Sequence, residues 1–399
     1  MISVDEALRL LEAESAPLDV VERSLEDARE LVLAETLTAD RDFPPTDRSA
    51  MDGYAVRVED VRDEGAVLEV IGELRAGQAV GDLRIGTGQT ARIMTGAIVP
   101  PGADAVVMVE KTEERTAGRQ VCIHDVPRAG QHIRRRGEDL EQGRTALEPG
   151  VPIRAAEVAA LTSIGRMTLR VHRPPTVQVL STGDEVVEPQ VEPLAHQVRN
   201  SNGHSLVAQL TDMGLAGSYL GIASDEREHL VGLVQRGLEA DLLLITGGVS
   251  AGKYDIVGDV LSAAGMRLVF HKVAVKPGKP MLAGRSGACL VIGLPGNPVS
   301  TFTMFAVFVA PILRRMLGYR CWENRRVHAT LTEPVRARAG REVYHLAWIE
   351  SGGDGLLARP VSSTGSGDVL ALARANGWIV TPPEGADHAV GATVSTLLR

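Results

Sequence analysis

The segment DLLLITGGVSAGKYD, residues 241–255, shows how the middle of the chain is built. Its first half is a continuous apolar run, which is typical of a strand buried on both faces of a parallel sheet. Gly247, Gly252 and Lys253 then match the G-x-x-x-x-G-K frame of a nucleotide-binding P-loop, which requires Ser or Thr at the next position to hold magnesium. That position is Tyr254, so we interpret the segment as a phosphate-handling loop of another kind, with the closing aspartate as its working residue.

Predicted strands and helices alternate around this segment, from Thr176 to about Gly318. VQVLST, MRLVFHKVAV and ACLVIGL predict strands, and SNGHSLVAQLTDMG, with apolar residues at helical spacing before a glycine stop, predicts a helix. Repeated βαβ units of this kind predict a doubly wound, mostly parallel α/β sheet. Such sheets bind ligands in the loops at the carboxyl ends of their strands.

Five loops at that expected rim carry acids, lysines or rigid turns: Asp184 and Glu185, Asp225, the 247–255 loop with Asp255, Lys276 and Lys279, and PGNP at 295–298. Carboxylates and lysines on one rim suit an anionic ligand with a divalent cation, since magnesium prefers one or two carboxylates plus ligand oxygens. Taken alone, each loop has a simpler interpretation. Asp225 would cap a helix, Glu185 would be a solvated acid, and PGNP would be only a turn.

The N-terminal region differs in pattern. MISVDEALRLLEAE predicts an acidic amphipathic helix that begins at a capping box of Ser3 and Glu6. Short Val- and Gly-rich alternations between residues 53 and 140 predict small β elements. Three polar residues stand in loops of this region and also fit simple Asx or ST turns: Asp52, Thr95 and Asp139. The arginine run 134–136, taken alone, fits a solvated charged face.

The tail, from about Arg325, consists of short alternating segments such as YHLAWIE and ATVSTLL, separated by Gly, Pro and Asp turns. This pattern predicts a small β-barrel or sandwich. STGSGD, residues 363–368, fits a loop that binds an oxyanion through backbone N–H groups. Taken alone, it fits better a helix start in which Ser366 is the cap.

Composition narrows the function classes. The 399 residues predict two to four domains. An aromatic content of 3% and a formal net charge of −9 argue against nucleic-acid binding. Cys122, Cys289 and Cys321 form neither a disulfide framework nor a CxxC metal site, and we expect each to be buried. No targeting segment is evident, and the apolar stretch 299–313 is shorter than the roughly 20 residues of a bilayer span, so we expect a cytoplasmic protein without membrane contact.

Longer motifs carry a family resemblance. TGGVSAGKYD, VAVKPGKPMLAG and GLPGNPVSTF resemble the molybdopterin-binding domain, which also occurs alone in the adenylyltransferase that activates molybdopterin. PPTDRSAMDGYAVR (44–57), the 92–113 segment and IRRRGEDL (133–140) resemble the N-terminal region of the molybdopterin molybdenumtransferases, the MoeA and gephyrin E-domain family. The chain departs from that family at Thr46 and Arg48, where Phe and Asn are frequent.

The resemblance implies a multidomain α/β protein. Residues 1–173 would form an elongated, mixed N-terminal region with a small β subdomain at about 53–140. Residues 174–322 would form the doubly wound molybdopterin-binding domain, and residues 325–399 a C-terminal β-barrel. The family's homodimers place the N-terminal lobe of one chain against the middle domain of the other, so a homodimer is expected here.

The implied reaction transfers molybdenum from molybdate into adenylylated molybdopterin and releases AMP, with a divalent cation, expected to be Mg²⁺. The implied metal and pyrophosphate ligands are Glu185, Asp225 and Asp255. The other catalytic positions carried over are Asp52, Thr95 and Asp139. The implied contacts to the pterin, phosphate or molybdate are Arg134, Gly247, Gly248, Ser250, Lys272, Lys276, Pro295, Pro298 and Ser366. A contact with the molybdopterin adenylyltransferase is a further implied partnership.

Two other functions fit the same central domain. The chain could itself be a molybdopterin adenylyltransferase, although its N- and C-terminal regions argue against that. It could also be a non-enzymatic scaffold that binds the finished cofactor, which the acids in every rim loop disfavour.

Overall fold

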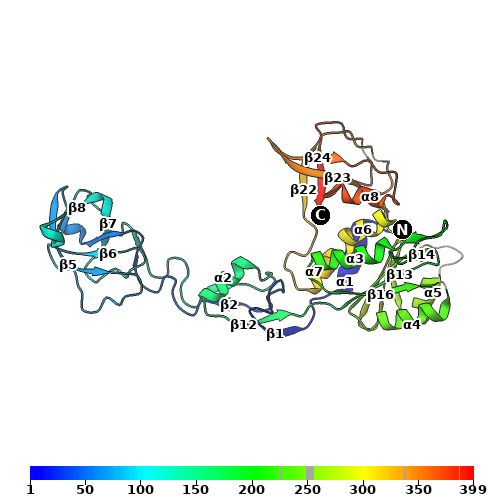
Figure 1. The fold of residues 1–399 in the computed structure, drawn as a ribbon, viewed down its shortest axis with the longest axis horizontal. Helices are drawn as coiled ribbons and strands as arrows, with labels where there is room; N and C mark the ends of the chain where they lie inside the picture. Colours follow the sequence, from blue (N-terminus) through cyan, green and yellow to red (C-terminus); the bar gives the residue numbers. More distant parts are fainter. Residues whose placement is uncertain (225, 249–255, 337, 386) are drawn as a thin grey trace. The chain divides into compact units, whose positions relative to one another are not determined.

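The computed structural model describes residues 1–224, 226–248, 256–336, 338–385 and 387–399 (Figure 1). The chain forms two compact units that interleave along the sequence. Unit 1 comprises Met1–Ala34, Pro149–Arg154 and Thr168–Arg399, and unit 2 comprises Glu35–Glu148 and Ala155–Met167. The expected ranges 1–173, 174–322 and 325–399 follow chain order, whereas the structure packs the first 34 residues with the α/β and barrel parts of unit 1.

The α/β part of unit 1 is built on a six-stranded sheet in the order β16-β13-β17-β21-β20-β18. Its strands are β13 (Val177–Thr182), β16 (Gly217–Ala223), β17 (Leu242–Thr246), β18 (Arg267–His271), β20 (Leu282–Ser286) and β21 (Cys289–Leu294). β16, β13, β17 and β21 run parallel, and β20 runs antiparallel to both of its neighbours. The predicted mostly parallel sheet is confirmed.

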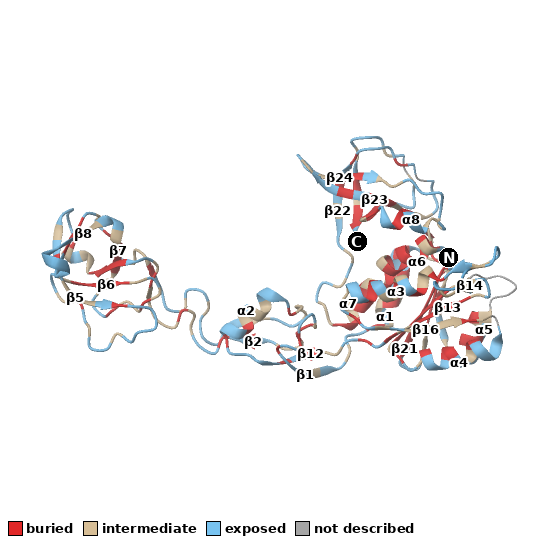
Figure 2. Ribbon diagram, in the orientation of Figure 1, coloured by how far each residue is buried: buried red, intermediate tan, exposed pale blue. Residues whose placement is uncertain are grey.

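Helices cover both faces of this sheet (Figure 2). Because side chains alternate along a strand, β17 contributes Leu242 and Leu244 to one core and Leu243 and Ile245 to the other. The first core also contains side chains of α1 (Val4–Ala13), α3 (Ser201–Asp212), α6 (Pro298–Met304) and α7 (Ala310–Met316). The second contains side chains of α4 (Arg227–Gly237) and α5 (Ile256–Ala263). The doubly wound arrangement predicted from the βαβ pattern is therefore present.

The helical stretch Pro298–Met316, the last in the α/β part, is continuous but contains a π-helical segment, Phe305–Val309, between α6 and α7. Pro311 lacks the N–H that would bond to a carbonyl one turn earlier. Asn324 supplies the missing donor, because its Nδ2 donates to the carbonyls of Ala306 (3.0 Å) and Val307 (3.1 Å). By length and composition this helix could cross a membrane, yet 78% of its most apolar window is buried inside unit 1.

The C-terminal part of unit 1 is a closed β-barrel, as predicted. Its strands pair in the order β23-β24-β22-β26-β25, and β25 pairs back to β23. The bounds are β22 (Arg326–Leu331), β23 (Glu342–Gly352), β24 (Gly355–Pro360), β25 (Gly377–Thr381) and β26 (Thr393–Leu398), with α8 (Val369–Ala373) before β25. A short strand from the α/β part, β19 (Val275–Lys276), pairs with β23 and so connects that part to the barrel.

Unit 2 contains a six-stranded sheet in the order β7-β4-β6-β5-β9-β8, in the part of the chain predicted to be β-rich. Its strands are β4 (Gly53–Val56), β5 (Ala66–Leu74), β6 (Gln89–Ile93), β7 (Ala105–Met108), β8 (Thr112–Arg115) and β9 (Gln120–Ile123). Two short ribbons, β3 (Arg48–Ser49) with β10 (Ile133–Arg134) and β2 (Leu37–Thr38) with β11 (Thr145–Leu147), and helix α2 (Ala155–Ser163) complete the unit.

The remaining short elements serve as connections. β1 (Val20–Ser24) pairs with β12 (Thr168–His172), and β14 (Val186–Val187) pairs with β15 (Val198–Arg199). Three single 3₁₀ turns, Val58–Asp60, Val109–Lys111 and Thr116–Gly118, lie in unit 2. Cys122 and Cys289 are buried as expected, but Cys321 is exposed, so the expectation of a buried role was wrong for that residue.

Candidate functional site

Glycines bring the loops at the carboxyl ends of β13 and β17 into close contact. Gly247 and Gly248 have positive φ angles of 91° and 61°. A Cβ at Gly247 would lie 2.5 Å from the Thr182 carbonyl oxygen, and one at Gly248 would lie 2.6 Å from Val257 Cγ2. Only glycine combines this conformation with this spacing, so the pair fixes the path of the backbone at the rim.

The first turn of α3 ties the rim loops together. Asn202 Nδ2 donates to Thr246 Oγ1 at 2.9 Å and to the Gly296 carbonyl at 2.7 Å, and so joins the ends of β17 and β21. Thr246 Oγ1 in turn donates to the Pro295 carbonyl at 3.0 Å. Neither Asn202 nor Thr246 was predicted from the sequence as a site residue. Two features of the sequence could have indicated them. Asn202 is an amide in the first turn of a predicted helix, and Thr246 is a hydroxyl at the end of an apolar strand.

Glu185 stands exposed on the loop after β13. Its backbone carbonyl accepts from Val198 N at 2.8 Å, and a Cβ added at Gly183 would lie 2.6 Å from Glu185 Oε2, so the carboxylate folds back over a glycine. No hydrogen bond to this carboxylate occurs among the residues that the structure describes. The expected companions Asp225, Ser250 and Asp255 lie outside the described residues.

A cavity of about 520 Å³ lies in unit 1, between the α/β part and the barrel. Three cationic side chains line it, Lys276, Lys279 and Arg341, and its described lining contains no carboxylate. The other polar side chains of its lining are Asn297, Tyr344, His345, Ser300, Ser363 and Ser366. A concave surface with these charges favours an anionic ligand of small-molecule size.

Burial sets the protonation state of one cavity residue. His345 is partly buried, and this burial, followed by the charges of Lys276 and His388, lowers its pKa to about 4. At neutral pH the imidazole is therefore uncharged, so it can offer one donor and one acceptor. Its Nε2 lies 3.3 Å from Thr381 Oγ1.

The structure brings together three of the residues predicted from sequence, because Lys276, Pro295 and Ser366 line the same cavity. Pro298 opens α6 beside it, whereas Lys272, with a φ of 71°, occupies the turn between β18 and β19 and is not among the lining residues. Arg341 and His345 were missed, since their place beside Lys276 depends on the pairing of β19 with the barrel.

The interpretation of Ser366 as a helix cap was wrong. Asp368 caps α8, with its carboxylate accepting from Ala371 N at 3.2 Å and from Thr364 N at 3.1 Å. These backbone hydrogen bonds, that of Thr364 foremost, lower the pKa of Asp368. Ser366 instead accepts through its carbonyl from Val299 N at 3.1 Å, which holds the 363–368 loop against the start of α6.

In unit 2 the expected residues form two hydrogen-bonded pairs. Asp52 Oδ1 accepts from both N (2.6 Å) and Oγ1 (2.8 Å) of Thr95, and these bonds lower the pKa of the Asp52 carboxyl. Arg134 forms an ion pair with Asp139. Strand β3 lies between the two pairs, since Ser49 bonds to Ala97 on one side and pairs with β10 on the other.

The arginine run 134–136 is matched by acids of the same unit. Arg135 pairs with Asp47 at 2.7 Å and Arg136 with Asp42 at 2.5 Å. Arg48, one of the two departures from the family pattern, donates to the Gly96 carbonyl at 2.9 Å. The run is therefore a set of ion pairs on the unit 2 surface, and any anion that it binds must compete with these carboxylates.

Comparisons with known proteins cover nearly the whole chain. Residues 2–165 match the MoeA N-terminal region (domain I and II), residues 178–315 a probable molybdopterin binding domain, and residues 328–398 the MoeA C-terminal region (domain IV). The molybdopterin molybdenumtransferase of Bacillus subtilis is 35% identical over 100% of this chain and 94% of its own. Molybdopterin molybdenumtransferase 2 of Mycobacterium tuberculosis is 36% identical over 84% of this chain and 90% of its own.

Solved structures agree with the sequence relatives. The molybdopterin biosynthesis moeA protein of Pyrococcus horikoshii OT3 superimposes with a TM-score of 0.86 at 28% identity and covers 100% of both chains. With three family regions in order and full-length relatives above 30% identity, the chain belongs to the molybdopterin molybdenumtransferases, an enzyme family of molybdenum cofactor biosynthesis.

Proposed function

We propose that this chain transfers molybdenum from molybdate into adenylylated molybdopterin and releases AMP. The observation that carries the proposal is the cavity lined by Lys276, Lys279 and Arg341 without a carboxylate among its described lining residues. Molybdate and the pterin phosphate are both oxyanions, and a guanidinium and two ammonium groups suit their charge. The neutral His345 adds a hydrogen-bonding group that does not depend on pH near neutrality.

Mg²⁺ fits the Glu185 loop. A hard cation takes carboxylate oxygens, and the Glu185 carboxylate is exposed and accepts no hydrogen bond from the described residues. When bound, the ion would neutralise charge on the phosphoryl oxygens. Lys276 and Arg341 would hold the oxyanion, while Asn202 keeps the β17 and β21 loops in register beside it.

The unit 2 pairs are proposed to approach the substrate from a second copy of the chain, in a C2 homodimer. Asp52, held by two bonds from Thr95, would present its other carboxylate oxygen, and the Arg134–Asp139 pair would open toward the anion. A cytoplasmic location and a contact with the molybdopterin adenylyltransferase, which would supply the substrate, belong to the same proposal. An adenylyltransferase activity of this chain itself is the candidate that the family comparisons do not favour.

The roles of Lys276 and Glu185 should separate in one experiment. Pure protein is incubated with adenylylated molybdopterin, molybdate and Mg²⁺, AMP release is followed, and pterin affinity is measured by calorimetry. Lys276→Ala should weaken affinity by about tenfold or more, because an oxyanion contact worth about 1.4 kcal/mol is lost. Glu185→Gln should leave affinity nearly unchanged and lower the saturated rate by well over about tenfold.

Arg359→Ala is the matched control, since Arg359 is an exposed cation of the same barrel that does not line the cavity. It should alter neither quantity. Unchanged affinity in Lys276→Ala, or lost affinity with an intact saturated rate in Glu185→Gln, would refute this division of roles. AMP release that requires ATP and not molybdate would instead identify an adenylyltransferase.

A further inference from the structure

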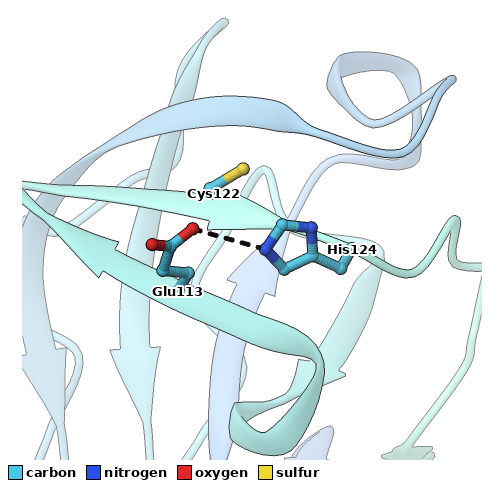
Figure 3. Close-up of side chains that lie close together, drawn as sticks. All are labelled: Glu113, Cys122 and His124. Atoms are coloured by element: carbon cyan, nitrogen blue, oxygen red, sulfur yellow. Dashed lines mark ion pairs between the residues drawn. The ribbon is translucent and has the colours of Figure 1, made fainter.

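We propose that Glu113, Cys122 and His124 of unit 2 form a binding site for a zinc-class metal ion, separate from the residues assigned to the substrate. A carboxylate oxygen, a thiol sulfur and an imidazole nitrogen of these side chains all lie within 4.8 Å of one another. Figure 3 shows Glu113 and His124 facing each other, with Cys122 on the strand beside them.

Strand pairing places the three side chains on one face. Glu113 of β8 and Cys122 of β9 are direct cross-strand partners. His124 follows Cys122 by two residues, which returns it to the same face of the strand. Its backbone N–H donates to the Lys111 carbonyl at 2.9 Å, so the ladder continues to this residue and holds its orientation.

This face is the one opposite the apolar core of the sheet. Val121 and Ile123, which alternate with Cys122 and His124, are buried in that core. Cys122 is nevertheless only 2% exposed, while Glu113 and His124 are exposed above it. β8 is an edge strand of the sheet, so the two outer ligands are open to solvent, and they would move aside for an ion to reach the sulfur.

The spacing suits one tetrahedral ion. Ligand bonds of about 2.0–2.2 Å place a nitrogen and an oxygen of the same zinc site about 3.4 Å apart. His124 Nε2 and Glu113 Oε2 are 3.6 Å apart in the ion-free protein. Side-chain adjustments of roughly 1 Å therefore complete a three-ligand site. The fourth position would hold water.

Ligand chemistry selects the class of metal. A thiolate with an imidazole favours Zn²⁺, Co²⁺ or Cd²⁺, whereas Mg²⁺ takes oxygen ligands. The thiolate and the carboxylate together balance a divalent charge. Arg115 lies 3.2 Å from Glu113 Oε2, but this exposed ion pair is weak, and Arg115 can remain as an outer partner of the carboxylate.

Cobalt titration of the chelator-treated full chain tests the site. We expect one Co²⁺ per chain with a sulfur-to-cobalt charge-transfer band, displaced by Zn²⁺ and unaffected by Mg²⁺. Cys122→Ser should abolish the band. Glu113→Gln and His124→Gln, both on exposed side chains and so compatible with folding, should each weaken cobalt affinity by at least about tenfold.

Cys321→Ser is the control, because Cys321 is the exposed cysteine and therefore the obvious competitor for cobalt. Its spectrum should match that of the unsubstituted protein. A band that disappears in Cys321→Ser and persists in Cys122→Ser would overturn the proposal. So would the absence of any charge-transfer band, or cobalt affinity that is unchanged in both Glu113→Gln and His124→Gln.

Discussion

Asn324 replaces a backbone donor that Pro311 cannot provide. Its Nδ2 bonds to the carbonyls four and five residues before the proline, those of Val307 and Ala306, while its Oδ1 accepts from Arg314. Both carbonyls belong to a helix that is largely buried. Leaving such groups without partners costs more than the hydrogen bonds are worth in net terms.

Asn324→Leu should therefore lower the free energy of unfolding by about 2–4 kcal/mol, measured by urea denaturation. Asn376→Leu is not a suitable control, because Asn376 bonds to the backbone of Ile349 in the barrel. The informative comparison is a double-mutant cycle with Pro311→Ala, which restores a helical N–H. If Asn324→Leu lowers the free energy of unfolding by the same amount with proline and with alanine at position 311, the two residues are not coupled.

A second residue-scale prediction concerns pH. Arg173 forms a two-pronged ion pair with Asp241 at 2.7 and 2.8 Å, and Thr176 N and Oγ1 each donate to the same carboxylate at 2.8 Å. The Arg173 hydrogen bonds are the main cause that lowers the pKa of Asp241 to about 2. A folded-state pKa below the unfolded one stabilises the protein above the unfolded pKa, and this stabilisation is lost as the pH falls toward 2.

Asp241→Asn should thus cost roughly 2 kcal/mol at pH 7, and the cost should shrink steadily as the pH is lowered from about 5 toward 2. Urea unfolding of both proteins across that range measures it. Asp19→Asn is the matched control, because Asp19 contacts the same Arg173 at 3.5 Å but is 86% exposed. A cost for Asp241→Asn that is independent of pH would contradict the assignment.

At the scale of the element, the first turn of α3 acts as a clamp on two strand ends. Asn202 joins the β17 and β21 loops, and both loops border the proposed substrate site. Asn202→Ala should lower AMP release by about tenfold, equivalent to about 1.4 kcal/mol of barrier, while stability falls by only about 1 kcal/mol. Thr211→Ala, in the last turn of α3 and remote from these loops, is the control and should change neither the rate nor the stability. If both variants lose the same rate, the effect comes from α3 as a whole and not from the Asn202 contacts.

The sequence was sufficient to predict those elements whose own residues carry the pattern of buried and exposed positions. β17 has four buried apolar side chains in a row, followed by the buried Thr246. The short barrel strands are separated by turns that contain Gly, Pro or Asp. MRLVFHKVAV was predicted as one strand, but the backbone breaks at Lys272, and β19 then pairs with the barrel. That choice depends on a strand some 70 residues away, which no local pattern contains.

The same reason accounts for what was missed at the sites. Lys276 was recognisable within its motif, whereas Arg341 and His345 become its neighbours only through the pairing of β19 with β23. Cys122 was expected to be an inert buried thiol, because its cross-strand pairing with Glu113 is invisible from spacing alone. Asp368, and not the predicted Ser366, caps α8, because the Asp368 carboxylate accepts hydrogen bonds from two backbone N–H groups at once.

At the scale of the whole molecule, the residues assigned to catalysis are divided between two compact units, with Asp52 in unit 2 and Glu185 in unit 1. If each active site combines these units from different chains, two inactive variants should complement each other. Mixing Asp52→Asn with Glu185→Gln under conditions of subunit exchange should restore about a quarter of the unsubstituted rate, because half of the dimers are mixed and each has one intact site.

Light scattering is the companion measurement and should give twice the 42.5 kDa chain mass. Mixing Asp52→Asn with a second unit 2 variant, Thr95→Val, serves as the control and should restore nothing. A stable monomer at micromolar concentration, or no rescue despite proven exchange, would place both residues' roles within one chain.

Because the two units interleave along the sequence, α1 is synthesised long before some of the residues that it contacts. α1 packs on β18, and Glu14, the residue that caps the C-terminus of α1, pairs with Arg267, which the ribosome adds 253 residues later. At about 5–20 residues per second, α1 waits roughly 10 to 50 seconds for its partner. Unit 2 is complete by residue 167 and can fold meanwhile, with the amphipathic α1 left uncovered. The nascent chain thus keeps the apolar face of α1 uncovered through most of its translation, until the α/β part that covers this face has been synthesised.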